Sequence, residues 1–229
     1  MEEPVRPTSA AVGDALRDVA GLGGFFVLPG TADTAGPRRA ASFADGFAER
    51  AREVNRRFGT SEARVGVSIV HLGLAARLWS PLLACTVLHG IVPDLRNLEW
   101  VDDTSAIRLQ RSPEGRPAGE LPDMVTAVYE QVAAPLQELE DTFEVKVAQR
   151  LLDGNAASAL VGSAAVLLRA RPEARSAVIR LTRDLLNVGR LVGTGSITGP
   201  DLTFRRRSCC LLYRAPNGGM CGDCCLSGR

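Results

Sequence analysis

The chain has 229 residues, of which 45% are hydrophobic and 23% charged, and its formal net charge is +1. This length suits one folded unit with a sizeable core, and the composition excludes a disordered chain, a membrane-embedded chain and a strongly basic nucleic-acid-binding protein. The N-terminal residues are acidic and broken by proline, without the charged and apolar regions of a secretion signal, so we expect a cytoplasmic protein.

The first sixty residues predict two helices. Apolar residues recur at helical spacing over residues 10–20, and the glycines at 21–24 end this helix before a short extended piece over 25–28. A polar loop over 31–39 leads to a second helix over 41–58, which Gly59 ends.

The apolar stretch over residues 65–92 predicts a buried helix pair. Polar residues such as His71, Arg77 and His89 interrupt it too often for a transmembrane segment. Because proline disfavours helix just before it, Ser80-Pro81 predicts two helices or one kinked helix. We expect both histidines to be hydrogen-bonded structural residues. The alternation over 98–109 then predicts a β-hairpin about a turn at 102–105.

The second half of the chain predicts mostly helices. After an exposed loop over 111–122, helical spacing extends from Met124 to about Leu152, where Asp153-Gly-Asn ends that helix and caps another over 156–170. A further helix is expected over 172–191, then a plain loop over 193–200. The predicted fold class is α+β, predominantly helical, with a small antiparallel β element and a C-terminal cysteine-rich segment.

Five of the six cysteines lie within residues 209–225, four of them in the order Cys209-Cys210-x10-Cys221-x2-Cys224. Four thiolates are what a [2Fe–2S] cluster requires, and a reducing compartment favours metal ligation over disulfides. Zinc is an alternative, although structural zinc sites normally use two C-x2-4-C pairs and this segment has one. Chance clustering of buried thiols is the other alternative.

The runs Arg206-Arg-Ser-Cys-Cys-Leu-Leu-Tyr-Arg and Gly218-Gly-Met-Cys-Gly-Asp-Cys resemble the signature of the bacterial ferric siderophore reductases of the ferrioxamine B reductase type. Weaker similarity covers residues 74–81, Leu88-His-Gly and Gly154-Asn-Ala. The resemblance implies a mainly helical domain over 1–200 and a cluster-binding segment over 201–229 packed on it. It also implies that the [2Fe–2S] ligands are Cys209, Cys210, Cys221 and Cys224. Cys225 exceeds the pattern and is expected to be a bystander, and Cys85 a small core residue.

By this resemblance, the protein reduces a cytoplasmic Fe(III)-siderophore, of hydroxamate type, by one electron and releases Fe(II). No nicotinamide fingerprint is visible, so the donor is expected to be a ferredoxin or a flavoprotein reductase, and no catalytic residue beyond the cluster is expected. The alternative function is an iron–sulfur redox or iron sensor, or an electron-transfer protein without a siderophore substrate. Four arginines lie near the cysteines in sequence: Arg205, Arg206, Arg207 and Arg214. They are expected to tune the reduction potential of the cluster, to dock the electron donor or to receive the siderophore. The alternative is that they are solvated surface residues.

Overall fold

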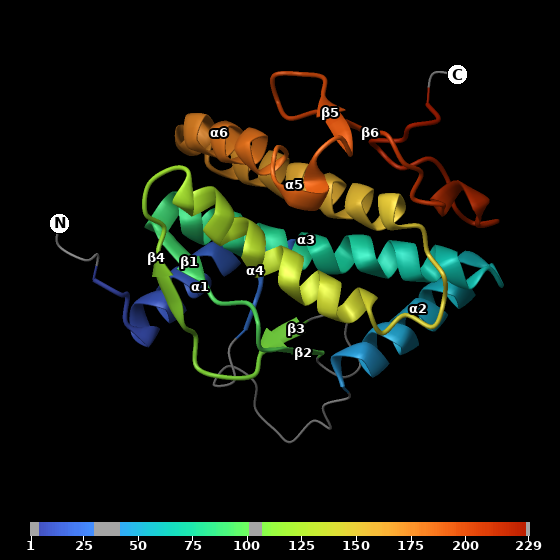
Figure 1. Cartoon of the computed structure of the whole chain (residues 1–229), viewed down its shortest axis with the longest axis horizontal. Helices are drawn as coiled ribbons and strands as arrows, with labels where there is room; N and C mark the ends of the chain where they lie inside the picture. The colour runs from blue at the N-terminus through green and yellow to red at the C-terminus, as the bar shows by residue number, and fades with distance from the viewer. Residues whose placement is uncertain (1–4, 30–41, 101–106, 228–229) are drawn as a thin grey trace.

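The computed structural model describes residues 5–29, 42–100 and 107–227. Figure 1 shows a helical body in which α3 lies beside α5, with the C-terminal segment on the outer side of α5. The helices are α1 (Ser9–Ala20), α2 (Phe43–Phe58), α3 (Ala63–His89), α4 (Asp123–Glu140), α5 (Gln149–Ala170) and α6 (Arg175–Leu185). The predicted fold class is confirmed, as are the two N-terminal helices.

The core is centred on α3 and α5, which contact each other along much of their length. Small side chains on α5 permit this close approach: the Trp79 indole N–H donates to the Ala156 carbonyl at 3.0 Å, and the Ser80 and Ser163 hydroxyls are 2.8 Å apart. Residues predicted as a pair of helices divided at Pro81 form one continuous helix, α3, with Pro81 inside it. Both α3 and α5 have the length and composition of a membrane span, but 78% of the most apolar window of each is buried within the fold.

The break predicted at Asp153-Gly154-Asn155 is wrong. Helix α4 ends at Glu140, and α5 begins at Gln149 and continues through all three residues. Local signals fail here because Asn155 is fully buried and its side chain is satisfied by other elements, while Gly154 faces the cysteine segment at close range. Tertiary packing therefore overrides the turn preference of Gly-Asn.

Three antiparallel strand pairs complete the described structure. The predicted hairpin is confirmed as β2 (Leu98–Trp100) paired with β3 (Ile107–Leu109), and its predicted turn lies outside the described residues. Two predicted loops instead contain strands: β1 (Ile91–Pro93) pairs with β4 (Gly115–Pro117), and β5 (Gly195–Ile197) pairs with β6 (Phe204–Arg206). Sequence patterns miss such three-residue strands because they are too short to show alternation.

Single turns of 3-10 helix link the main elements. Gly24–Phe26 forms η1 where an extended piece was predicted, and the helix predicted over 172–191 divides into η3 (Pro172–Ala174), α6 and η4 (Gly189–Leu191). The last turn, η5 (Leu212–Arg214), lies within the cysteine segment. The division into domains at residue 200 stays a prediction, and the β5–β6 ladder crosses it.

Candidate metal centre

The cysteine segment, residues 206–226, lies against two core helices. Strand β6 contacts α5, and η5 contacts α3 (Figure 1). On the α3 side, the Ser68 hydroxyl donates to the Cys210 carbonyl at 2.7 Å. On the α5 side, the Ser158 hydroxyl donates to the Asp223 carboxylate. The segment is thus held to the fold on both sides by residues next to predicted ligands.

The five clustered cysteines have graded exposure. Cys210 and Cys224 are buried, whereas Cys209, Cys221 and Cys225 are half-buried. The Cys210 and Cys221 side chains lie within hydrogen-bonding reach. Cys85 is separate from this group: it lies in the hydrophobic core, as predicted, where burial raises its pKa to about 12.

Backbone geometry folds the segment back on itself. Leu211, directly after the adjacent cysteine pair, has φ of +67°, a left-handed conformation that a leucine rarely adopts. A Cβ on Gly218 would lie 2.1 Å from the Leu212 carbonyl oxygen, so only glycine fits there. The Cys224 N–H donates to the Cys221 carbonyl at 3.2 Å and closes the second ligand pair into a turn.

Two backbone N–H groups point at sulfur atoms. The Leu211 N–H donates to Cys209 Sγ at 3.3 Å, and the Leu226 N–H donates to Cys224 Sγ at 3.4 Å. Such N–H···S bonds favour the charged thiolate, and in iron–sulfur proteins they help to set the reduction potential. The segment therefore stabilises negative sulfur in both halves of the motif.

The prediction that Arg206 docks a siderophore or an electron donor is wrong. Its side chain is 1% exposed, so it does not offer a docking contact to a siderophore or a donor. Its guanidinium donates to Asn155 Oδ1 at 2.8 Å and to the Leu151 carbonyl at 3.2 Å, and the Asn155 amide in turn donates to Ser68 Oγ at 3.1 Å. This buried network was missed, although the weak similarity at Gly154-Asn-Ala marked its central residue.

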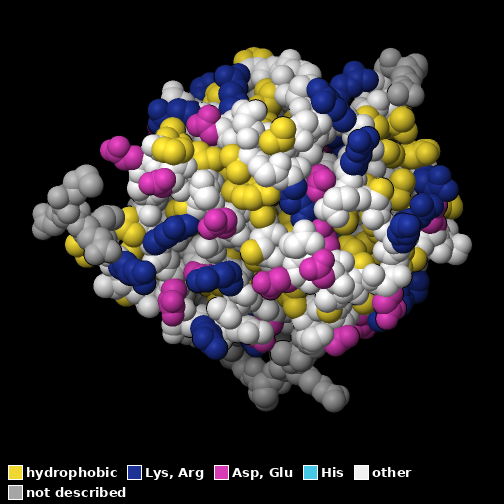
Figure 2. All heavy atoms as spheres, in the orientation of Figure 1, with side chains coloured by type: hydrophobic (Ala, Val, Ile, Leu, Met, Phe, Trp, Pro, Cys, Tyr) yellow, Lys and Arg dark blue, Asp and Glu magenta, His cyan; other side chains and the backbone are white. Residues whose placement is uncertain are grey.

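The other three arginines of the prediction are exposed. Arg205 donates to the Ser227 carbonyl at 2.5 Å and Arg207 to the Gly193 carbonyl at 3.3 Å. Arg214 pairs with Glu62 at 2.6 Å, and this hydrogen bond is the main cause that lowers the pKa of Glu62. In Figure 2, Lys and Arg side chains gather with hydrophobic ones over the C-terminal part of the fold, at the upper right.

A second polar cluster braces the helices that carry the segment. His71 Nε2 lies 2.7 Å from Glu140, which accepts two hydrogen bonds from Arg190 at 2.8 Å, and Arg190 Nε donates to Asp153 at 2.7 Å. Burial lowers the pKa of His71. This confirms His71 as a hydrogen-bonded structural residue that ties α3 to α4 and α5. His89 similarly pairs with Asp18 at 2.9 Å.

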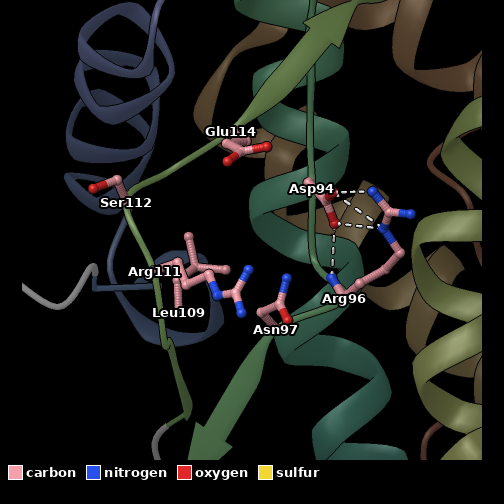
Figure 3. Close-up of a pocket in the computed structure, with 7 residues that line it drawn as sticks. All are labelled: Asp94, Arg96, Asn97, Leu109, Arg111, Ser112 and Glu114. Carbon is pink, nitrogen blue, oxygen red and sulfur yellow. Dashed lines mark hydrogen bonds and ion pairs between the residues drawn. The ribbon is translucent and has the colours of Figure 1, made fainter.

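A cavity of about 380 Å³ lies apart from the cysteines, where the β1, β2, β3 and β4 strands connect (Figure 3). Asp94 and Arg96 face each other in it, with Arg96 Nε 2.9 Å from an Asp94 carboxylate oxygen, so their charges are mutually satisfied. The rest of its lining is mixed polar and apolar: Asn97, Leu109, Arg111, Ser112 and Glu114.

The thiols of the cysteine segment are the donors that an iron–sulfur cluster uses. Within residues 5–29, 42–100 and 107–227, no three His, Cys, Asp or Glu side chains are arranged around one point as ligands of one metal ion. A [2Fe–2S] cluster instead takes two protein thiolates at each iron. Burial raises the pKa of the Cys209 and Cys221 thiols, and metal binding would displace their protons, because the thiolate is the form that ligates metal. The donor set and its N–H···S bonds fit that cluster.

Four soft thiol donors on one short, tightly turned segment define an iron–sulfur class of site. Residues 206–226 match the family described as FhuF 2Fe-2S C-terminal domain, and this match contains all five clustered cysteines. It confirms the resemblance drawn from the cysteine motif, and it indicates a [2Fe–2S] cluster as the cofactor. No curated protein and no solved structure matches the chain.

Proposed function

We propose that this protein is a ferric siderophore reductase that delivers one electron to Fe(III) held by a hydroxamate-type siderophore in the cytoplasm. The observation that carries the proposal is the match of residues 206–226 to the FhuF 2Fe-2S domain, together with the half-burial of two of the four predicted ligands, Cys209 and Cys221. A siderophore holds Fe(III) in hard oxygen ligands, which bind the softer Fe(II) much less tightly. One electron therefore releases the iron.

In this proposal, Cys209, Cys210, Cys221 and Cys224 hold the cluster. When bound, the cluster supplies a centre that accepts and releases single electrons. Cys210 and Cys224 would hold it from buried positions, and Cys209 and Cys221 would hold it from half-buried ones. Close approach to the surface supports direct electron exchange with a partner.

The exposed surface beside these cysteines supports docking. Tyr213 is 48% exposed and Met220 is 65% exposed, and both lie between the two ligand pairs in sequence. Arg205 and Arg207 are exposed nearby. Apolar side chains with a positive rim suit an acidic ferredoxin or a flavoprotein reductase, or an anionic siderophore. Each Fe(III) reduced to Fe(II) takes one electron from the ferredoxin or flavoprotein, which is oxidised by one electron.

A single-turnover experiment tests the proposed reaction. The protein is purified without oxygen, reduced, freed of reductant and mixed with a ferric hydroxamate and a ferrous-specific chelator. We expect the visible spectrum of the oxidised protein to return as the ferrous chelate forms, with one Fe(II) for each electron held. Cys85→Ala should behave as wild type because this thiol lies in the core. If the cluster is reduced and reoxidised normally but reacts with no ferric hydroxamate, the result would instead favour the sensor or electron-transfer function.

A further inference from the structure

Arg206 is a buried cation whose bonds are only partly satisfied. Its Nη2 group donates to Asn155 and to the Leu151 carbonyl, but its Nε and Nη1 groups have no hydrogen-bond partner within the described residues. The Ser208 hydroxyl, two residues along, is also buried without a partner. A buried donor without an acceptor destabilises a fold, more so if it is charged, so three such donors together call for an acceptor.

The charge of Arg206 is also unpaired. No carboxylate in the described part of the chain lies within ion-pair distance of it, whereas Arg190, which is also largely buried, pairs with both Glu140 and Asp153. Burying an uncompensated charge is strongly unfavourable. Of these two arginines, only Arg206 lacks a carboxylate partner in the described residues. This indicates that its counter-charge is a group other than a protein carboxylate.

Arg206 and Ser208, which carry the unpartnered groups, are joined to the segments that hold the predicted ligands. The Arg206 backbone N–H donates to the Asp223 carbonyl at 3.1 Å, which joins β6 to the turn between Cys221 and Cys224. The Arg206 charge is close enough to Cys221 to interact with it electrostatically. Ser208 precedes Cys209 directly.

We propose that Arg206 is the internal counter-cation of the [2Fe–2S] cluster, with its free N–H groups and the Ser208 hydroxyl directed at the cluster's sulfur atoms. Four thiolates give the cluster a net negative charge, and one-electron reduction makes it more negative. A buried cation and donors at this place therefore stabilise the reduced form more than the oxidised form and raise the reduction potential. Arg206 acts as a positioning and tuning residue, not as a contact for substrate.

Two residues of α5 set the position of the guanidinium. Asn155 fixes its Nη2 edge at 2.8 Å, and Gly154 leaves room for it, because a Cβ on Gly154 would lie 2.9 Å from Nη2. This inference rests on ligation by the four cysteines of the proposed function, and it is independent of whether a siderophore is the substrate.

The test compares Arg206→Gln with Arg207→Gln, which removes the same charge from an exposed site one residue away. Potentials are measured by anaerobic redox titration followed by electron paramagnetic resonance (EPR), with iron and sulfide content measured on each sample. For Arg206→Gln, we expect the ratio of reduced to oxidised cluster at a fixed potential to fall at least tenfold, which is 59 mV for one electron. For Arg207→Gln, the ratio should change less than twofold.

Two milder variants keep the proposal testable if Arg206→Gln fails to assemble a cluster. Ser208→Ala removes one donor and keeps the charge, so the ratio of reduced to oxidised cluster should fall about threefold. Arg206→Lys keeps the charge but loses the several N–H donors of the guanidinium, so its reduction potential should lie between those of wild type and Arg206→Gln. Loaded variants with an unchanged potential would overturn the proposal, as would an equal shift for Arg207→Gln. The readout needs no siderophore, so a protein that fails to reduce ferric hydroxamates could still confirm the role of Arg206.

Discussion

Gly154 and Gly162 lie in the same helix, α5, but substitution by alanine should have opposite effects at the two positions. An added Cβ at Gly154 would lie 2.1 Å from Ser208 Oγ and 2.9 Å from Arg206 Nη2. At Gly162 no atom lies within 4 Å of the added Cβ. Gly154→Ala therefore presses the cysteine segment away from α5, whereas Gly162→Ala changes only the helix itself.

The expected magnitudes follow from these contacts. Alanine favours a helix interior over glycine by up to about 1 kcal/mol, which is the whole effect expected at Gly162. At Gly154 the same gain is opposed by overpacking, about 1–3 kcal/mol, and by loss of the charged hydrogen bond between Arg206 and Asn155, about 1.5–3 kcal/mol. The free energy of unfolding should fall by about 1.5–5 kcal/mol.

Thermal unfolding of the two variants, with iron and sulfide measured on each, checks this reasoning. At about 2–4 °C for each kcal/mol, Tm should rise by up to about 4 °C for Gly162→Ala and fall by at least about 3 °C for Gly154→Ala. Gly154→Ala should also lose cofactor on storage. If both variants gained stability equally, the close packing of α5 on the cysteine segment would be refuted.

Two further predictions concern His71 and Cys225. Burial lowers the pKa of His71, so the unfolded chain takes up a proton as the pH falls through the ordinary value of about 6.5, while the folded chain does not. The free energy of unfolding should therefore fall between about pH 7.5 and 5.5. In denaturant titrations, His71→Gln should flatten that part of the profile. An unchanged slope in that variant would mean that other groups set the pH dependence. Cys225→Ser should retain the iron and sulfide content of the wild type, because the other four thiols complete the motif; loss of both would make Cys225 a ligand.

The long elements were predictable because their signals are local. Helix α2 has an amphipathic pattern with Ser42 before it and Gly59 after it, and the structure uses both as caps. The hairpin of β2 and β3 was found because Leu98 and Trp100 alternate with polar residues and pair with Leu109 and Ile107. The cysteine motif was also local, since its spacing alone identified the segment that the family comparison matched.

The missed features depend on contacts between distant residues. Asn155 favours a turn by local preference, and only its bonds to Ser68 and Arg206 explain why it lies inside a helix. Arg206 could not be distinguished from Arg205 and Arg207 by sequence, because in strand β6 the side chains alternate between faces and only the packing on α5 decides which face is buried. Burial of one arginine among three is a property of the assembled fold.

The metal content and spectrum of protein purified without oxygen test most directly whether the four cysteines bind a [2Fe–2S] cluster. We expect two irons and two inorganic sulfides for each chain, and an EPR signal that appears on one-electron reduction. We also expect serine at any one of the four proposed ligands to lower the cofactor content or alter the spectrum. A colourless protein with one zinc and no sulfide would show that these cysteines do not bind a [2Fe–2S] cluster. So would an unaltered spectrum in all four variants: Cys209→Ser, Cys210→Ser, Cys221→Ser and Cys224→Ser.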